Sequence, residues 1–249
     1  MEQDLKILLC GEADSESDLG EILTHIGNTL SLVIGQIPSL LESSEQQMSL
    51  YGPFIGRSIL ELGCTAIIGR LDPFRVLVLR EVQRQSDYNI STRNRISIQW
   101  QGDVVAKQKI PNLWSDKNMT EITRALVGDY YDHIFWRSAI DKLIDTVPSG
   151  RGGEWFGQMR GIGGRGFCSS ARGTIQACYS SLSKGLHYEF VIPPESLFDR
   201  STVTDLIRES LFVIASFGLA MTQIPHIPYG ISLDRAMNIY ENVQEMEIR

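Results

Sequence analysis

The chain has 249 residues, of which 43% are hydrophobic and 21% charged, and its formal net charge is -7 at pH 7. These values are ordinary for a globular protein with a sizeable core, made of one large domain or two small ones. The surplus of acidic residues excludes a protein that coats nucleic acid over its whole surface, but not a local basic patch. The longest apolar candidate, residues 59–79, contains four charged residues, so we expect no membrane-spanning segment. The acidic N-terminus does not resemble a secretory signal, and we expect a cytoplasmic protein.

Residues 1–18 are predicted to form an N-terminal segment that is partly flexible. Its apolar run, residues 5–10, fits either a small strand or part of a helix, and the acidic stretch that follows is typical of a loop. From residue 19 to residue 37, apolar residues recur at the three- and four-residue steps of an amphipathic helix. No internal repeat or linker divides residues 19–249, which we predict to be a single helical domain.

Two more helices are predicted before residue 90. The first runs from about Pro53 to Leu71, and the second from Pro73 to about Gln85, because Asp72 is a favourable N-cap and proline suits the first helical position. Beyond them, apolar and polar residues alternate before a Gly-Asp turn signal. We therefore predict a small β-hairpin or extended excursion near residues 94–106.

Helical spacing returns over residues 122–144. The glycine-rich residues 148–166 are predicted to be a loop or an interrupted segment, and a helix follows them. The predicted fold is therefore mainly α: a single helical-bundle domain with the excursion near 94–106.

The last two helices are predicted from apolar residues at helical spacing, over residues 203–221 and 233–243, and from their N-caps. Thr202, with Asp205 three residues later, resembles a capping box at the start of a central helix that reaches Met221. Ser232 can cap a final helix.

The four cysteines contain no C-x-x-C pair and match no common metal spacing. They are Cys10, Cys64, Cys168 and Cys178. We predict that they are small buried hydrophobic residues, and that the chain holds no metal and no other cofactor.

The helix that follows the glycine-rich segment separates polar from apolar residues. At 100° per residue its polar residues share an arc of about 120°. They are Arg172, Gln176, Ser180, Ser183, Lys184 and His187. A separate apolar arc, with Ile175, Cys178, Tyr179, Leu182 and Leu186, gives the helix a core to join. The polar arc gathers cationic and titratable groups at which a phosphate or carboxylate could bind.

His187 is the candidate catalytic residue, because an imidazole can transfer protons near neutral pH. Ser183 and Lys184, four and three residues earlier, can share its face of the helix. The alternative is a histidine that caps the end of the helix and bonds locally, with Gly185 easing the turn.

Four arginines are candidates for binding an anion or a nucleic acid, because a guanidinium can bind two phosphate oxygens at once. They are Arg151, Arg160, Arg165 and Arg172. Residues 161–166 formally match G-x-G-x-x-G, but no strand precedes them, so the dinucleotide-binding interpretation fails. A flexible basic loop that meets RNA, DNA or a nucleotide, and a solvated loop without a ligand, both stay open.

A second group of charged residues lies within strongly apolar helices. It consists of Arg57, Glu61, Arg70, Asp72 and Arg75. Charges on largely buried helices are generally paired, because desolvating one alone is costly. We predict a structural ion-pair network, and the alternative is that one of these arginines reaches the His187 face and completes a phosphate site.

The string Tyr179-x-x-Leu182-Ser183-x-x-Leu186-His187 resembles the C-terminal motif of HEPN-type helical proteins, over about residues 120–222. That superfamily includes metal-independent ribonucleases of toxin and antiviral defence systems. The nuclease members place an arginine before the histidine with four to six residues between them, where this chain has Ser180, Ser181 and Leu182. The resemblance thus implies a helical protein in which His187 is carried over and the arginine is not.

Three functions follow as expectations. The first is a HEPN-like protein that binds RNA, a nucleotide or a protein partner, in a bacterial defence or stress module. The second is a metal-independent endoribonuclease in which His187 is the general acid and base, and Lys184 and an arginine steady the phosphate. The third is a non-catalytic assembly subunit that forms a homo-oligomer through an apolar helix surface.

Overall fold

The computed structural model describes residues 2–89, 126–185 and 198–245. Within these three ranges all regular secondary structure is helical and no strand occurs, which confirms the mainly α fold. The predicted hairpin near residues 94–106 lies outside the described residues, as does His187. No helix of the described residues combines the length and apolar character that crossing a membrane requires.

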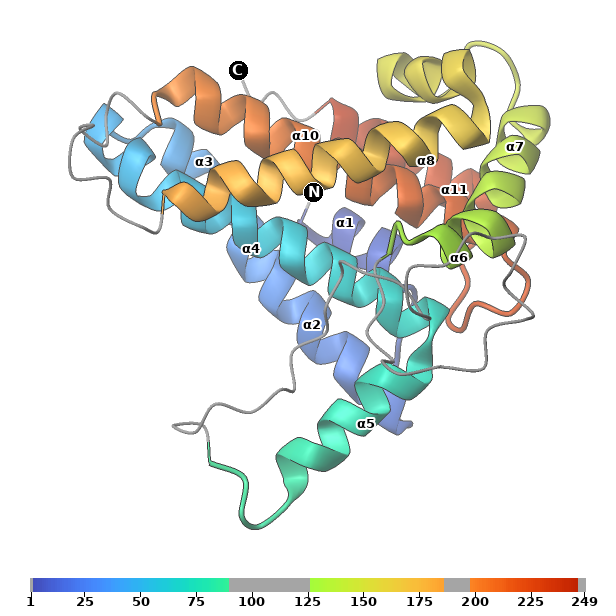
Figure 1. Cartoon of the computed structure of the whole chain (residues 1–249), viewed down its shortest axis with the longest axis horizontal. Coiled ribbons are helices and arrows are strands. Elements are labelled where there is room, and N and C mark those ends of the chain that lie inside the picture. Colours follow the sequence, from blue (N-terminus) through green and yellow to red (C-terminus); the bar gives the residue numbers. More distant parts are fainter. Residues whose placement is uncertain (1, 90–125, 186–197, 246–249) are drawn as a thin grey trace.

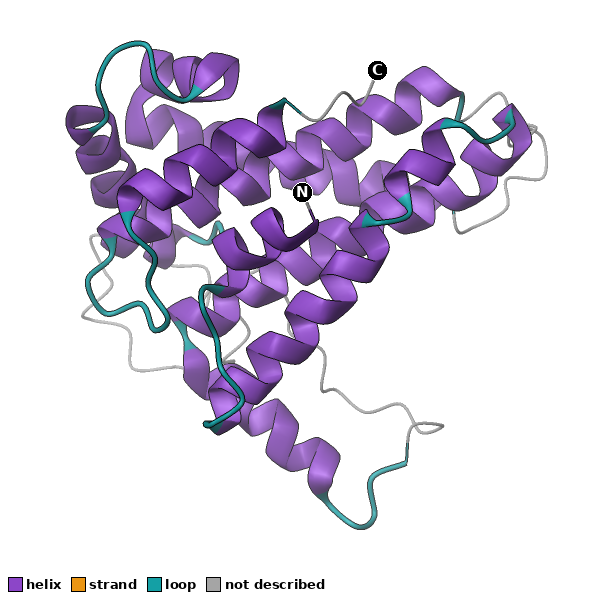
Figure 2. Cartoon of the chain, turned by 180° about the vertical axis from the view of Figure 1, so that it is seen from behind, coloured by secondary structure: helices purple, strands orange, loops and turns teal. Residues whose placement is uncertain are grey.

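The helices follow in this order: α1 (Glu2–Cys10), α2 (Asp18–Ile34), α3 (Ile37–Leu41), α4 (Glu45–Leu71), α5 (Pro73–Arg84), α6 (Asp129–Tyr131), a π-helical turn (Asp132–Trp136), α7 (Arg137–Thr146), α8 (Gly153–Lys184), α10 (Arg200–Ala220), a 3-10 turn (Met221–Gln223) and α11 (Leu233–Gln244). Their arrangement is shown in Figure 1 and, from behind, in Figure 2.

The long helix α4 lies at the centre of the bundle, with α2 on one side and α8 and α10 on the other, while α5 projects at one end (Figure 1). The core between these helices is continuous, because α4 and α10 bury apolar residues over most of their length. Burial of such side chains stabilises the fold by about 1.5–3 kcal/mol each. All four cysteines are buried and unbridged, as predicted.

The apolar run near the N-terminus forms α1, and its residues Leu5, Leu8 and Leu9 are fully buried. This settles the choice between strand and helix, because the run packs against α2, α10 and α11 rather than pairing with a strand. Residues 2–10 therefore contribute to the core of the bundle.

Helix α4 begins eight residues before the predicted start at Pro53. Ser44 and Gln47 form a capping box there: the Ser44 hydroxyl accepts from the Gln47 N–H at 3.2 Å, and the Gln47 side chain accepts from the Ser44 N–H at 3.2 Å. A proline normally disrupts a helix interior because it lacks a donor. Here Pro53 is buried beside Gly185 at the end of α8.

The start of α10 also differs from the prediction. Asp199 is the N-cap, and its carboxylate accepts a hydrogen bond from the Thr202 N–H at 2.7 Å. Thr202 therefore lies inside the helix, because the charged carboxylate of Asp199 is a stronger hydrogen-bond acceptor than the hydroxyl of Thr202. At the last helix the prediction is confirmed: Ser232 caps α11 and accepts from the Arg235 N–H.

Residues 153–184 form helix α8, so a loop over all of residues 148–166 is wrong, and the alternative of an interrupted segment is confirmed. The helix is interrupted only at Gly163, whose φ of 67° and ψ of 175° turn the chain sharply between two helical parts. The second part is capped from α7, because the Asp141 carboxylate accepts from the Gly164 N–H at 2.7 Å. The glycines of the G-x-G-x-x-G match thus form a helix corner. The first N–H group after the corner already donates to the carboxylate of Asp141.

Candidate functional site

The polar face predicted for the motif helix is confirmed up to residue 184. Gln176, Ser180 and Lys184 are exposed on α8, whereas Ile175, Cys178 and Leu182 are buried in the core. Ser183 donates its hydroxyl proton to the Tyr179 carbonyl at 2.6 Å, within the same helix.

Arg151 does not face the motif end of α8, because it is held by α11. Its guanidinium donates to Asn238 at 2.7 Å and pairs with Glu241 at 3.3 Å and with Asp234 at 3.4 Å. Glu241 also accepts from the Gly152 N–H at 2.8 Å. The arginine that was predicted to bind an anion thus fixes the start of α8 to α11.

The Glu241 contact makes stability dependent on pH. Burial alone would raise the pKa of Glu241, but hydrogen bonds from Arg151 and the Gly152 N–H, with the charge of Arg151, lower the pKa below its ordinary value of 4.5. A carboxyl whose pKa is lower in the folded state stabilises the fold fully above its unfolded pKa, and the contribution is lost as the pH falls through the folded value. We therefore expect Glu241→Gln to reduce the free energy of unfolding more at about pH 7 than at about pH 3.5, as measured by urea titration. An equal loss at both pH values would contradict this role.

Two other candidate arginines donate to main-chain carbonyls. Arg160 donates to the Val147 carbonyl at 2.8 Å, and Arg172 donates to the Val127 carbonyl at 2.8 Å and pairs with Asp129 at 2.7 Å. Both therefore join α8 to the segments around α7 and α6. Arg172 is also distant from Lys184 along the helix, because twelve residues correspond to about 18 Å.

Arg165 is the one candidate of these four that is exposed and has no partner among the described residues. It begins the second part of α8, nineteen residues before Lys184, a distance of about 28 Å along the helix. The four arginines therefore do not converge on the motif end of α8.

The predicted ion-pair network is present as separate pairs. Arg57 bonds to Glu61 at 3.0 Å and Arg75 to Asp72 at 3.1 Å. The two pairs lie about 16 Å apart along α4. The hydroxyl of Tyr131 also donates to Asp72, at 3.1 Å.

Arg70 departs from that prediction, because its guanidinium bonds to main-chain carbonyls instead of carboxylates. It donates to Leu8 and Leu9 at 3.3 Å, to Pro228 at 3.1 Å and to Tyr229 at 3.0 Å. The residue is only 2% exposed, and this burial lowers the pKa of Arg70 to about 10. Arg70 therefore joins the end of α1 to the loop before α11 and is not available to a ligand.

Arg57 contacts the motif helix. It donates to the hydroxyl of Tyr179 at 3.0 Å, and its guanidinium carbon lies 4.8 Å from the centre of that ring. Its side chain remains 24% exposed, so a further ligand can approach it. Lys184 is about 140° from Tyr179 around α8 at 100° per residue, so it lies on another side of the helix.

Exposed apolar residues continue the surface around Arg57 along α4. Leu50, Phe54, Arg57 and Glu61 follow one another at steps of four, three and four, which places them in one stripe. Leu50 is 49% exposed, Phe54 56% and Tyr51, beside it, 57%. We call this surface the Arg57 face: it consists of Leu50, Tyr51, Phe54, Arg57, Glu61 and Tyr179.

Sequence reasoning identified Arg57 and Glu61 but missed the aromatic residues beside them. Tyr51 and Phe54 fall on the polar side of α4 when the helix is extended back to Glu45, and that position was the available signal. Tyr51 was missed because the helix was expected to begin at Pro53, whereas Phe54 lay within the expected helix, three residues before Arg57.

In comparisons with known proteins, no family model, no curated protein and no solved structure matches this chain. The class that the fold itself defines is a mainly α helical bundle. Within the described residues, no cluster of three or more histidine, cysteine, aspartate or glutamate side chains is placed to hold a metal ion.

Proposed function

We propose that this chain is a HEPN-like helical protein that binds single-stranded RNA or a nucleotide through the Arg57 face. The observation that carries the proposal is the contact between Arg57 and Tyr179, which brings a partly exposed guanidinium onto the motif helix. An RNA-binding role also fits the defence or stress setting that the resemblance implies.

The residues of the Arg57 face suit a single strand better than a duplex. Exposed aromatic rings such as Tyr51 and Phe54 can stack on bases, a contact worth about 1–3 kcal/mol per base, and a neighbouring arginine can bind the phosphate. A duplex buries its bases and offers no ring to stack on. The proposed ligand is therefore an unpaired nucleotide or a short single strand.

Glu61 opposes this binding and thereby supplies a sharp test. Its carboxylate repels phosphate and competes for Arg57, with which it pairs at 3.0 Å. We expect Arg57→Gln to weaken binding of a single-stranded RNA oligomer about tenfold, and Glu61→Gln to strengthen it several-fold, in anisotropy titrations at low salt. Phe54→Ala should weaken it by a similar factor to Arg57→Gln.

Arg165→Gln is the matched control, because it removes the same charge from an exposed site on the far part of α8. It should change affinity little, and wild-type binding should weaken steeply as salt rises. Equal losses for Arg57→Gln and Arg165→Gln would indicate only long-range attraction. No binding of RNA or nucleotide at low salt would overturn the proposal.

A second candidate is the metal-independent endoribonuclease, favoured by the exposed polar face that leads to Lys184. It requires RNA cleavage that persists in the presence of a chelator and is lost in His187→Ala. Binding without cleavage leaves the non-catalytic protein. If neither is observed, a multimeric mass in light scattering that becomes monomeric in Phe54→Asp would support the assembly subunit instead.

A further inference from the structure

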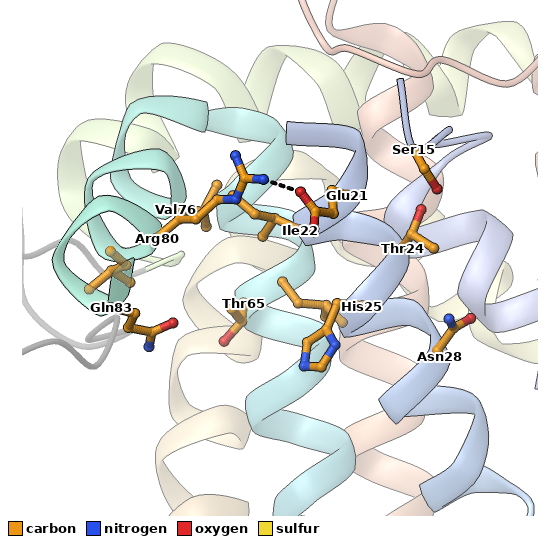
Figure 3. Close-up of a pocket in the computed structure, with 12 residues that line it drawn as sticks. Ser15, Glu21, Ile22, Thr24, His25, Asn28, Thr65, Val76, Arg80 and Gln83 are labelled. Carbon is orange, nitrogen blue, oxygen red and sulfur yellow. Dashed lines mark hydrogen bonds and ion pairs between the residues drawn. The ribbon is translucent and has the colours of Figure 1, made fainter. Parts of the chain in front are cut away.

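A groove with a volume of about 580 Å³ lies between α2 and α5, above α4 (Figure 3). One part of its lining is apolar: Ile22 and Ile26 come from α2, and Val76 and Leu79 from α5. The volume and the apolar walls are typical of sites for small molecules. A flat, partly apolar ligand would therefore fit between the two helices.

The charged groups at one end of the groove form ion pairs with one another. Arg80 pairs with Glu21 (Figure 3) and also with Asp18. Its side chain is only 11% exposed. The hydrogen bond to Arg80 lowers the pKa of Asp18, and the same bond raises the pKa of Arg80, so the pair stays ionised. Arg84 also pairs with Glu21 at 3.9 Å and with Glu81 at 3.5 Å, so three carboxylates surround two guanidinium groups and leave no net positive charge for an anion. The groove therefore disfavours a phosphate.

The unused hydrogen-bonding groups of the groove are uncharged or weakly basic. The side chains of Gln83 and His25 are exposed and have no partner among the described residues. The Thr65 hydroxyl donates to the Glu61 carbonyl at 2.7 Å, which leaves its oxygen free to accept. An amide can bind two groups on the edge of a nucleobase at once, and hydroxyl oxygens suit a ribose.

We infer that this groove binds an uncharged nucleoside, with the base between the apolar side chains of α2 and α5 and its edge on the Gln83 amide. This inference does not depend on RNA binding at the Arg57 face, which lies on α4 and α8. The groove takes the ligand without its phosphate, whereas the Arg57 face requires the phosphate.

Adenosine and uridine are titrated against the full chain by calorimetry and by ligand-observed NMR. At least one should bind saturably with one-to-one stoichiometry, and the corresponding 5′-monophosphate should bind about tenfold more weakly, because Glu21 and Asp18 repel it. Gln83→Ala and Thr65→Val should each weaken nucleoside binding about tenfold.

The controls separate this site from the Arg57 face. Gln176→Ala removes an exposed amide from α8, and Arg57→Gln alters the other face, so both should leave nucleoside affinity unchanged. Gln83→Ala should in turn leave RNA affinity unchanged. Absence of saturable binding for both nucleosides, a tighter monophosphate, or equal affinity in Gln83→Ala would each overturn the inference.

Discussion

Replacing Arg70 with methionine should lower the free energy of unfolding by about 3–5 kcal/mol. The side chain is buried and donates to four main-chain carbonyls, two of them at the C-terminal end of α1. Methionine fills much of the volume but donates no hydrogen bond, so these carbonyls lose their partners at a cost of about 1–3 kcal/mol for each one that water cannot reach. The positive charge that favours the end of the α1 helix dipole is lost as well.

Urea unfolding measures this effect, and with a slope of about 2 kcal/mol/M the midpoint should fall by about 1.5–2.5 M. Arg70→Lys should lie between methionine and wild type, because it keeps the charge but cannot reach both segments with a planar fork. Arg165→Met should stay within about 0.5 kcal/mol of wild type, because Arg165 is exposed. A loss below about 1 kcal/mol for Arg70→Met would show that water reaches the carbonyls.

The second large effect is expected at the helix corner in α8. A Cβ on residue 164 would lie 2.5 Å from the Arg137 carbonyl oxygen and 2.8 Å from Asp141 Oδ1. Since the first contact is with main chain, α7 and α8 must move apart, and the cap from Asp141 to the Gly164 N–H is strained. Gly164→Ala should therefore destabilise the protein by about 3 kcal/mol, or about 6–12 °C in Tm for a chain of this size.

Gly157→Ala is the matched control for the helix corner. Position 157 is also helical and exposed, and a Cβ there meets nothing within 4 Å. Because alanine favours a helix over glycine, this variant should gain about 0.5–1 kcal/mol. If Gly164→Ala also stabilised the protein in thermal unfolding, the close approach of α7 to α8 would be wrong.

Much of the fold could be predicted from the sequence because the buried face of a helix appears as apolar residues at regular three- and four-residue spacing. The 3.6-residue period located α2, α10 and α11, and the buried and exposed sides of α8 followed from the same rule. Helix α5 was located by the proline at its start. The errors concerned the first residues of helices, where neighbouring side chains compete to cap the same N–H groups. Helices α4 and α10 begin at Glu45 and Arg200 because Ser44 and Asp199 cap their first amides.

Less of the candidate site could be predicted. Sequence spacing gave the pair of Arg57 and Glu61, since residues four apart in a helix are neighbours. The contact between Arg57 and Tyr179 joins residues 122 apart and depends on how α4 packs against α8. No period along one helix contains that information.

The sequence by itself therefore determined the helical class, the amphipathic faces and the burial of the four cysteines. Only the tertiary structure decided what these cations do: Arg70 and Arg172 hold main-chain carbonyls, Arg151 holds α11, and Arg57 bonds to Tyr179 on the motif helix. The physical reason is that helix formation depends on neighbours within one turn, whereas a long cationic side chain binds the acceptor that packing brings within its reach.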